Sequence, residues 1–159
     1  MDQPSDPEHD LELRWGKDLF NRVWTLLEME KRSPDEDMEM IHAVHASSFH
    51  WRRVGQPVNF ARGEWQCSRV YATLGRAEPA LFHAERCLAI CTENGIGDFD
   101  LAFAYEALAR AYAVAGDRVE SARWADRART ACGEIKDDDD REIVLTDLSA
   151  LPEPAGGVR

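Results

Sequence analysis

The chain has 159 residues, of which 44% are hydrophobic, and its formal net charge is −11. That length is enough for one domain with a hydrophobic core. The negative charge argues against nucleic-acid binding by general electrostatic attraction. The chain has no run of about 18 apolar residues, which argues against a membrane span. The first ten residues are acidic and polar, unlike a secretory or mitochondrial presequence, so we expect a cytoplasmic protein.

Acidic residues are concentrated toward the two ends of the chain. Residues 49–133 hold 10 acidic and 11 basic residues, whereas the rest holds the other 20 acidic and 8 basic ones. Acidic runs such as residues 137–140 are typically solvated and keep a protein soluble. We therefore interpret the ends as solubilising flanks around a balanced central region.

Helical patterns cover almost the whole chain, and no segment shows the alternation expected of a strand. Asp6 followed by Pro7 predicts the start of a helix that runs to about Arg32. Residues 33–36, Ser-Pro-Asp-Glu, match a capping box and predict a second helix that ends before Gly55. Further helices are expected over about residues 57–74, 78–92, 98–115, 117–135 and 141–151.

The central region contains an internal repeat with a period of 41 residues. Residues 60–91 align without a gap to residues 101–132, and eight positions are identical. The pairs are Ala61/Ala102, Arg69/Arg110, Tyr71/Tyr112, Ala72/Ala113, Gly75/Gly116, Ala84/Ala125, Arg86/Arg127 and Cys91/Cys132. A period in the range of roughly 20–50 residues indicates stacked supersecondary units, here helical hairpins that bury a shared core.

The two copies resemble tetratricopeptide repeats (TPR). In the second copy, Tyr105, Leu108-Ala109, Tyr112 and Gly116-Asp117 match that family's first helix and turn. The first copy matches at Cys67-Ser68, Tyr71 and Gly75, but Glu64 stands where the family has an aromatic residue. In the second helix of each copy, the family's small positions fall on Ala80, Ala84 and Cys87, and on Ser121, Ala125 and Ala128. The family's large residue in that helix and its terminal proline are missing, and the repeat is longer than the family's unit.

The resemblance implies an all-α fold: an α-α superhelix of three helical hairpins (TPR-like) with a short C-terminal capping helix. We expect a single domain over residues 1–159. Its parts are an N-terminal hairpin at 8–54, repeat 1 at 57–94, repeat 2 at 98–135 and an acidic tail or cap at 136–159.

In TPR proteins, ligands lie in the groove lined by the first helix of each hairpin. The resemblance therefore implies a ligand- or peptide-binding groove lined by Arg62, Trp65, Arg69, Thr73, Phe103, Glu106, Arg110 and Val114. Arg69 and Arg110 are equivalent in the two copies, and two guanidinium groups beside an indole suit a carboxylate or phosphate together with an apolar side chain. The alternative is that these arginines form salt bridges between helices, with Glu64, Glu106 or Glu85. A third possibility is that the acidic stretch 137–147 folds back onto Arg69 and Arg110 as a ligand supplied by the chain itself.

Histidines and cysteines offer a second set of candidates. His42, His45 and His50 share the second predicted helix, but their spacing does not place them on one face and no HExxH motif is present. A further ligand would have to come from elsewhere, with His83 or His9 as candidates. The four cysteines, Cys67, Cys87, Cys91 and Cys132, lie in helical patterns without a CxxC pair and are interpreted as reduced core thiols. His83 precedes Cys87 by one helical turn, which is a weak pattern for a reactive thiol.

These observations favour a non-enzymatic module that binds a protein or peptide segment, with no catalytic residue, no metal and no cofactor. One alternative is a small metal- or ligand-dependent enzyme that uses the region of His42, His45 and His83. Another is a purely structural subunit that oligomerises. The tryptophan-rich first hairpin, with Trp15, Trp24 and Trp51, is either core or an apolar patch for a homodimer.

Overall fold

The structure is a computed structural model that describes residues 6–153. Residues 1–5 and 154–159, the latter being the end of the expected acidic tail or cap at 136–159, lie outside the described range. Over residues 6–153 it contains seven helices and no strand, which confirms the expected all-α class. Their bounds are α1 Pro7–Leu27, α2 Pro34–Val54, α3 Pro57–Thr73, α4 Ala77–Glu93, α5 Asp98–Ala115, α6 Arg118–Cys132 and α7 Asp138–Ser149.

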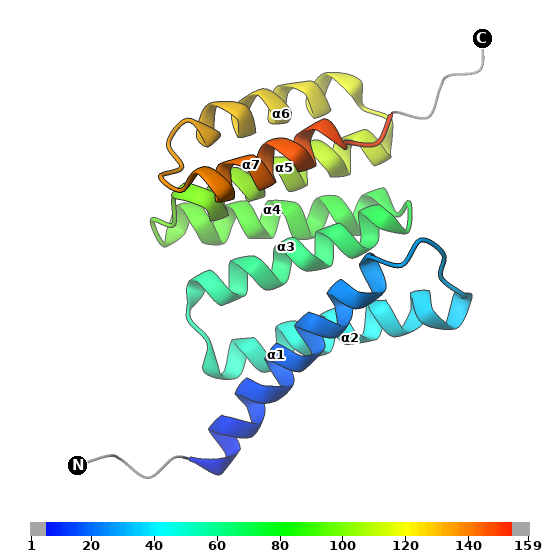
Figure 1. Cartoon of the computed structure of the whole chain (residues 1–159), viewed down its shortest axis with the longest axis vertical. Coiled ribbons are helices and arrows are strands. Elements are labelled where there is room, and N and C mark those ends of the chain that lie inside the picture. Colours follow the sequence, from blue (N-terminus) through cyan, green and yellow to red (C-terminus); the bar gives the residue numbers. More distant parts are fainter. Residues whose placement is uncertain (1–5, 154–159) are drawn as a thin grey trace.

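The helices pack as three successive hairpins, α1/α2, α3/α4 and α5/α6, which follow one another along the long axis of the molecule (Figure 1). Helix α3 also contacts α2 and α5, and α4 contacts α5, so that neighbouring hairpins share their cores. Helix α7 lies against α5 and α6. The hairpin arrangement therefore extends over the described chain, with α7 as a cap at its C-terminal end.

Side-chain caps fix several helix starts as the sequence predicts. The carboxylate of Asp6 accepts a hydrogen bond from the Glu8 N–H (3.0 Å), and Ser33 and Glu36 form the expected reciprocal capping box. The carboxylate of Asp117 accepts from the Glu120 N–H (3.0 Å). Each of these bonds satisfies a backbone donor that has no partner within its helix.

Three helix ends differ from expectation. Helix α1 ends at Leu27 instead of about Arg32, because the Arg32 side chain turns back and donates to the carbonyl oxygens of Leu26 and Met29. Residues 28–33 are thereby free to form the turn into α2. Helix α6 ends at Cys132, three residues early, and α7 is capped by Asp137, so that it starts three residues earlier than predicted.

The two repeat copies close their turns in the same way. Gly75 and Gly116 have φ values of +71° and +80°. Each permits a backbone bond that closes the helix end, from Arg76 N to Tyr71 O (2.9 Å) and from Asp117 N to Tyr112 O (3.0 Å). The repeated glycine is therefore required by backbone geometry.

A second shared feature joins the two helices of each hairpin. In the first copy the Ser68 hydroxyl donates to the Ala80 carbonyl (2.8 Å), and in the second the Ser121 hydroxyl donates to the Ala109 carbonyl (2.8 Å). Positions 68 and 109 are equivalent, and so are positions 80 and 121. The same pair of positions is therefore bonded in both copies, with the hydroxyl on opposite helices.

The core is divided between the two ends of the stack. The first hairpin and α3 bury one cluster around Val23, Leu26, Met40 and Val70, and helices α3 to α7 bury a larger one around Leu108, Ile135 and Val144. A small third cluster joins α3, α4 and α5 through Ala72, Ala80 and Ala111. No helix within residues 6–153 combines the length and the apolar character that a bilayer crossing requires.

The glycine geometry gives a stability test. Gly75→Ala and Gly116→Ala each force a Cβ into a left-handed conformation, although neither Cβ would meet another atom within 4 Å. We expect each to lower the free energy of unfolding by about 1–2 kcal/mol in urea denaturation. Gly75→Asn and Gly116→Asn are the matched controls, because Asn adds a Cβ at the same positions but tolerates the left-handed conformation better than Ala does. Equal losses for the Ala and Asn variants would show that the backbone conformation is not the cause.

Candidate functional site

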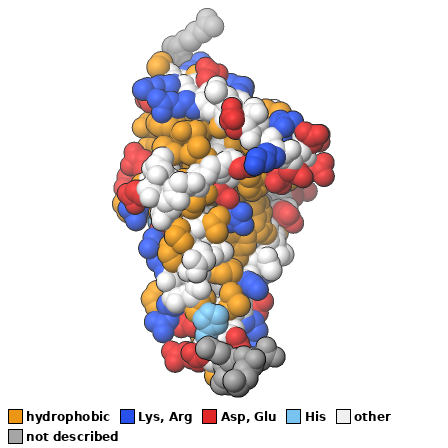
Figure 2. Space-filling view, turned by 90° about the vertical axis from the view of Figure 1, so that its left-hand side faces the viewer, with side chains coloured by type: hydrophobic (Ala, Val, Ile, Leu, Met, Phe, Trp, Pro, Cys, Tyr) orange, Lys and Arg blue, Asp and Glu red, His pale blue; other side chains and the backbone are white. Residues whose placement is uncertain are grey.

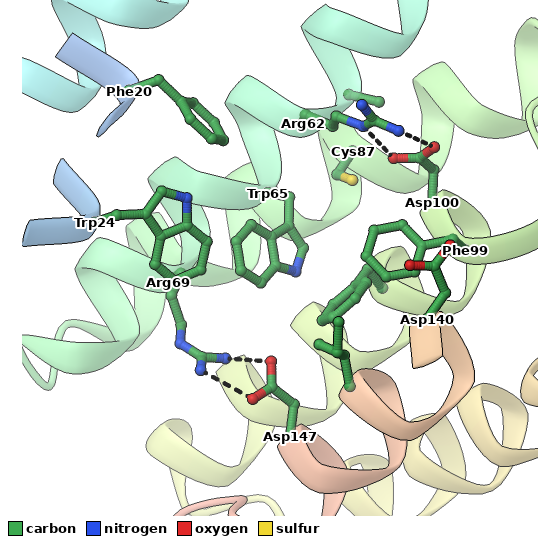
Figure 3. Close-up of a pocket in the computed structure, with 13 residues that line it drawn as sticks. Phe20, Trp24, Arg62, Trp65, Arg69, Cys87, Phe99, Asp100, Asp140 and Asp147 are labelled. Carbon is green, nitrogen blue, oxygen red and sulfur yellow. Dashed lines mark hydrogen bonds and ion pairs between the residues drawn. The ribbon is translucent and has the colours of Figure 1, made fainter. Parts of the chain in front are cut away.

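A cavity of about 540 Å³ lies between α1 and α7, with α3 and α5 as its floor. Helices α1 and α7 both line it but make no packing contact with each other within the described chain. The cavity is thus open between these two helices, and we call it the α1/α7 groove. Its lining residues are Phe20, Trp24, Ala61, Arg62, Trp65, Arg69, Cys87, Phe99, Asp100, Phe103, Asp140, Ile143 and Asp147 (Figure 3).

Aromatic rings form a continuous row through this groove. Successive ring centroids lie 6.5 Å apart for Phe20 and Trp24 and 5.6 Å apart for Trp24 and Trp65. The row continues with Trp65 and Phe103 at 5.2 Å and with Phe103 and Phe99 at 4.6 Å. Trp65 and Phe103 are buried in the floor, whereas the other three rings are half-buried and form the walls. These spacings are those of favourable edge or tilted aromatic contacts.

One rim of the groove carries a bidentate ion pair. Arg62 on α3 donates from Nε and Nη2 to the two carboxylate oxygens of Asp100 on α5, at 2.7 and 3.0 Å (Figure 3). The hydrogen bonds to Asp100 raise the pKa of the Arg62 guanidinium above its usual value. This pair joins the second and third hairpins and leaves Arg62 engaged within the chain.

The other charged group centres on a buried carboxylate. Glu106 is 0% exposed and accepts from Arg110 Nε (2.7 Å), Arg69 Nη1 (3.4 Å) and Trp65 Nε1 (3.4 Å). The guanidinium of Arg69 also lies 5.6 Å from the centroid of the Trp65 ring. One carboxylate therefore connects the two equivalent arginines and the indole of the floor.

Helix α7 adds further hydrogen-bond acceptors to this charged group. The Asp147 carboxylate accepts from Arg69 at 3.3 and 3.4 Å, and the Asp147 backbone carbonyl accepts from Arg110 Nη2 at 3.0 Å. The acidic C-terminal segment thus reaches both arginines, as one of the sequence-based hypotheses states. The alternative hypothesis, that these arginines form salt bridges between helices, also holds, because Arg69 on α3 binds Glu106 on α5. The two hypotheses therefore describe parts of one network.

The predicted groove residues divide into three sets, one of which, Thr73 and Val114, does not line the cavity. Arg62, Trp65, Arg69 and Phe103 line the cavity. Glu106 and Arg110 lie beneath it, and with 0% and 8% exposure they support the floor instead of facing the groove.

Sequence reasoning missed the α1 wall of the groove, whereas the α7 wall belongs to the acidic stretch 137–147, which one of the sequence-based hypotheses folds back onto Arg69 and Arg110. Phe20 and Trp24 come from α1, and Asp140, Ile143 and Asp147 come from α7; neither helix belongs to the two repeat copies. Trp24 stands out in the sequence only as part of the tryptophan-rich first hairpin. No repeat register relates Phe20 and Trp24 to the groove, so the sequence held no signal for these two side chains beyond their apolar character.

The cysteines are buried and unbridged over the described chain, which agrees with their interpretation as core thiols. Cys87 lies at the back of the cavity (Figure 3). Its hydrogen bond with Cys91 and its burial raise the pKa of the Cys87 thiol well above the usual value. A neutral thiol of this kind is a poor nucleophile.

His50 lies in one contact between helices, and His45 and His83 lie together in another. Nδ1 of His50 lies 2.5 Å from the Glu12 carboxylate, which joins α2 to α1. His45 on α2 and His83 on α4 approach each other, with ring centroids 5.4 Å apart, whereas His42 is exposed and is not part of that group.

Glu64, the residue that departs from the TPR pattern, is buried and binds Nδ1 of His83 (2.6 Å) and Nη2 of Arg52 (2.9 Å).

Comparison with known proteins adds no identification: no family model, no curated protein and no solved structure matches this chain.

The buried carboxylate gives a second stability test. Glu106→Gln leaves the buried guanidinium of Arg110 without a carboxylate partner and leaves Arg69 with Asp147 alone, so we expect the free energy of unfolding to fall by about 3–5 kcal/mol. The measurement is equilibrium denaturation, with Glu85→Gln on the exposed face of α4 as the control that removes a charge from the surface. A loss no larger than that of the control would mean that the network contributes little to stability.

Proposed function

We propose that this protein is a non-enzymatic interaction module whose α1/α7 groove binds a segment of a partner protein. The segment inserts a bulky apolar side chain into the aromatic cavity and places a basic residue next to it. The single observation that supports this proposal most is the row of five aromatic rings around an open cavity of about 540 Å³.

The size and lining of the cavity suit an apolar anchor. Binding pockets typically measure about 300–1,000 Å³ and combine apolar walls with a few polar groups. Ile143, at the α7 edge, is 49% exposed although it belongs to this lining, so the apolar surface continues to the rim. Figure 2 shows hydrophobic surface interleaved with charged side chains along one face of the molecule. Large apolar side chains left half-exposed around a cavity are typical of contact sites.

The charges at the rim favour a basic partner over an acidic one. Arg62 is neutralised by Asp100, and Arg69 by Glu106 and Asp147. Asp140 also lines the cavity and takes part in no ion pair among the described residues. The chain as a whole carries a formal charge of −11. The net negative charge attracts a basic partner at long range, and the Asp140 carboxylate attracts it locally, so both favour a basic partner.

Helix α7 has two roles in this proposal. Its Asp147 supplies the carboxylate that the paired arginines would otherwise take from a ligand, which removes the reason to expect an acidic or phosphorylated ligand at that point. Its N-terminal half supplies one wall of the groove. The occupant then runs between α1 and α7, along the aromatic row.

The proposal is tested by selecting peptides from a random phage-displayed library on the purified chain. We expect the selected peptides to share a bulky apolar residue close to Lys or Arg. Ile143→Glu should weaken their binding by about tenfold or more, equivalent to about 1.4 kcal/mol, in fluorescence polarisation. Asp140→Asn should reduce both the affinity and its dependence on salt.

Val119→Glu is the matched control, because Val119 is also an exposed apolar helix residue (77%) but does not line the cavity. Its affinity for the selected peptides should equal that of the unmodified chain. Peptides that bind the Ile143 and Val119 variants equally well, or a library that yields no binder, would refute the groove as the binding surface.

A further inference from the structure

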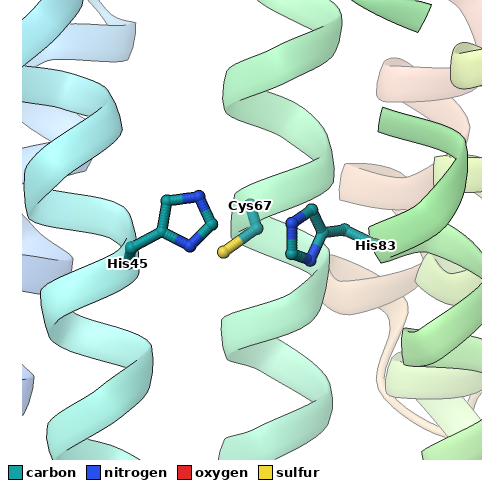
Figure 4. Close-up of side chains that lie close together, drawn as sticks. All are labelled: His45, Cys67 and His83. Atoms are coloured by element: carbon teal, nitrogen blue, oxygen red, sulfur yellow. The ribbon is translucent and has the colours of Figure 1, made fainter. Parts of the chain in front are cut away.

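A second cluster of functional side chains lies away from the groove, where three consecutive helices meet. His45 on α2, Cys67 on α3 and His83 on α4 each place one possible ligand atom so that all three atoms lie within 4.8 Å of one another. Figure 4 shows the two imidazole rings on either side of the Cys67 thiol. None of these residues lines the α1/α7 groove.

We propose that His45, Cys67 and His83 form a binding site for a divalent ion of the zinc class, with three protein ligands and a fourth position open to solvent. This inference does not depend on the proposed peptide binding. Two imidazoles and one thiolate are ligands that Zn²⁺ takes in tetrahedral sites.

The separations are compatible with such an ion. Ligand atoms around tetrahedral zinc lie about 3.3–3.6 Å apart, given bonds of about 2.0–2.1 Å to nitrogen and 2.3 Å to sulfur. The three atoms, at up to 4.8 Å, therefore need to approach one another by about 1 Å. Helix α3 packs directly against α2 and against α4, so the proposal requires rotation of the three side chains and no movement of the helices.

An outer carboxylate holds one of the imidazoles in a suitable orientation. Nδ1 of His83 is bonded to Glu64 at 2.6 Å, and Glu64 is itself held by Arg52 at 2.9 Å. This arrangement leaves Nε2 of His83 for an ion, and metal-binding histidines commonly bond a carboxylate through the other ring nitrogen. The polar residue that interrupts the TPR pattern at position 64 thereby acquires a role as a positioning residue.

In the second repeat copy, the positions equivalent to 64, 67 and 83 carry no carboxylate, thiol or imidazole. Positions 64 and 83 correspond to Tyr105 and Trp124, which stack with ring centroids 5.9 Å apart. Position 67 corresponds to Leu108, which is buried. An aromatic and aliphatic contact between the two helices is therefore sufficient for this hairpin. The first copy instead has a carboxylate, an imidazole and a thiol at the same three positions.

The cluster also has a route for entry. Cys67 is 1% exposed, His83 is half-buried and His45 is exposed, so the ligands run from the interior to the surface. Tyr71, one turn after Cys67, bonds Nε2 of His45 through its hydroxyl (2.8 Å) and stacks on His83 at 5.8 Å. It holds both rings near the thiol when no ion is bound.

The test uses the full chain without an affinity tag, kept reduced and treated with chelator, and titrated with Co²⁺ as a spectroscopic substitute for Zn²⁺. We expect one equivalent of Co²⁺ to produce a thiolate-to-cobalt charge-transfer band in the near ultraviolet, and one equivalent of Zn²⁺ to abolish it. Absence of that band at one equivalent would overturn the proposal.

Variants assign the ligands. Cys67→Ser should remove the charge-transfer band, and His45→Gln, at an exposed position, should weaken Co²⁺ binding at least tenfold. His42→Gln, one turn earlier on α2, and Cys132→Ser, another buried thiol, should leave the band and the affinity unchanged. Circular dichroism and a thermal melt establish that each variant is folded. Undiminished binding by both His45→Gln and Cys67→Ser would place the ion elsewhere and refute the site.

Glu64→Gln tests the positioning role separately. Loss of an outer carboxylate typically weakens metal affinity by about 10–100-fold while the ligands stay the same. We therefore expect weaker Co²⁺ binding with an unchanged charge-transfer band at saturation. Unaltered affinity would overturn the role assigned to Glu64.

Discussion

The buried carboxylate of Glu106 is the interaction on which the C-terminal half of this structure depends. It binds Arg110 on its own helix, Arg69 on α3 and the indole of Trp65. A carboxylate with no exposure is costly to bury unless it is fully paired, so these partners have little freedom to leave it. The two repeat copies are thereby joined through their equivalent arginines. Because the same arginines bind α7, the network also sets where the last helix lies.

The groove follows from this arrangement. Helix α7 is held at its C-terminal half by Arg69 and Arg110, and its N-terminal half faces α1 across the cavity. The arginines that a tetratricopeptide-like groove would offer to a ligand are already satisfied, and what remains open is aromatic. The specificity that we propose therefore rests on apolar anchoring and an acidic rim, in place of a clamp for carboxylate.

The two copies of the repeat show how one backbone design supports two kinds of interior. Both use a glycine with positive φ at the hairpin turn and a serine hydroxyl between their helices. Between those fixed points the second copy packs Tyr105 on Trp124, whereas the first pairs Glu64 with His83. The turn glycines and the serine hydrogen bonds fix the backbone of each hairpin. The positions between them can therefore carry polar side chains, as Glu64 and His83 do. This is the basis for locating a candidate metal site in one copy and not in the other.

The sequence by itself determined the helical class, the helix starts at Asp6, Ser33 and Asp117, and the repeat, because these depend on local periodicity, on caps within three residues and on glycine at the turns. The resemblance to tetratricopeptide repeats also pointed to Arg62, Trp65, Arg69 and Phe103, which line the groove. Only the tertiary structure decided which residues form the walls, because Trp24 and Ile143 are far apart in the chain and outside the repeat. The same holds for His45, Cys67 and His83: helical spacing relates residues on one helix, and these three meet only because α2, α3 and α4 pack side by side.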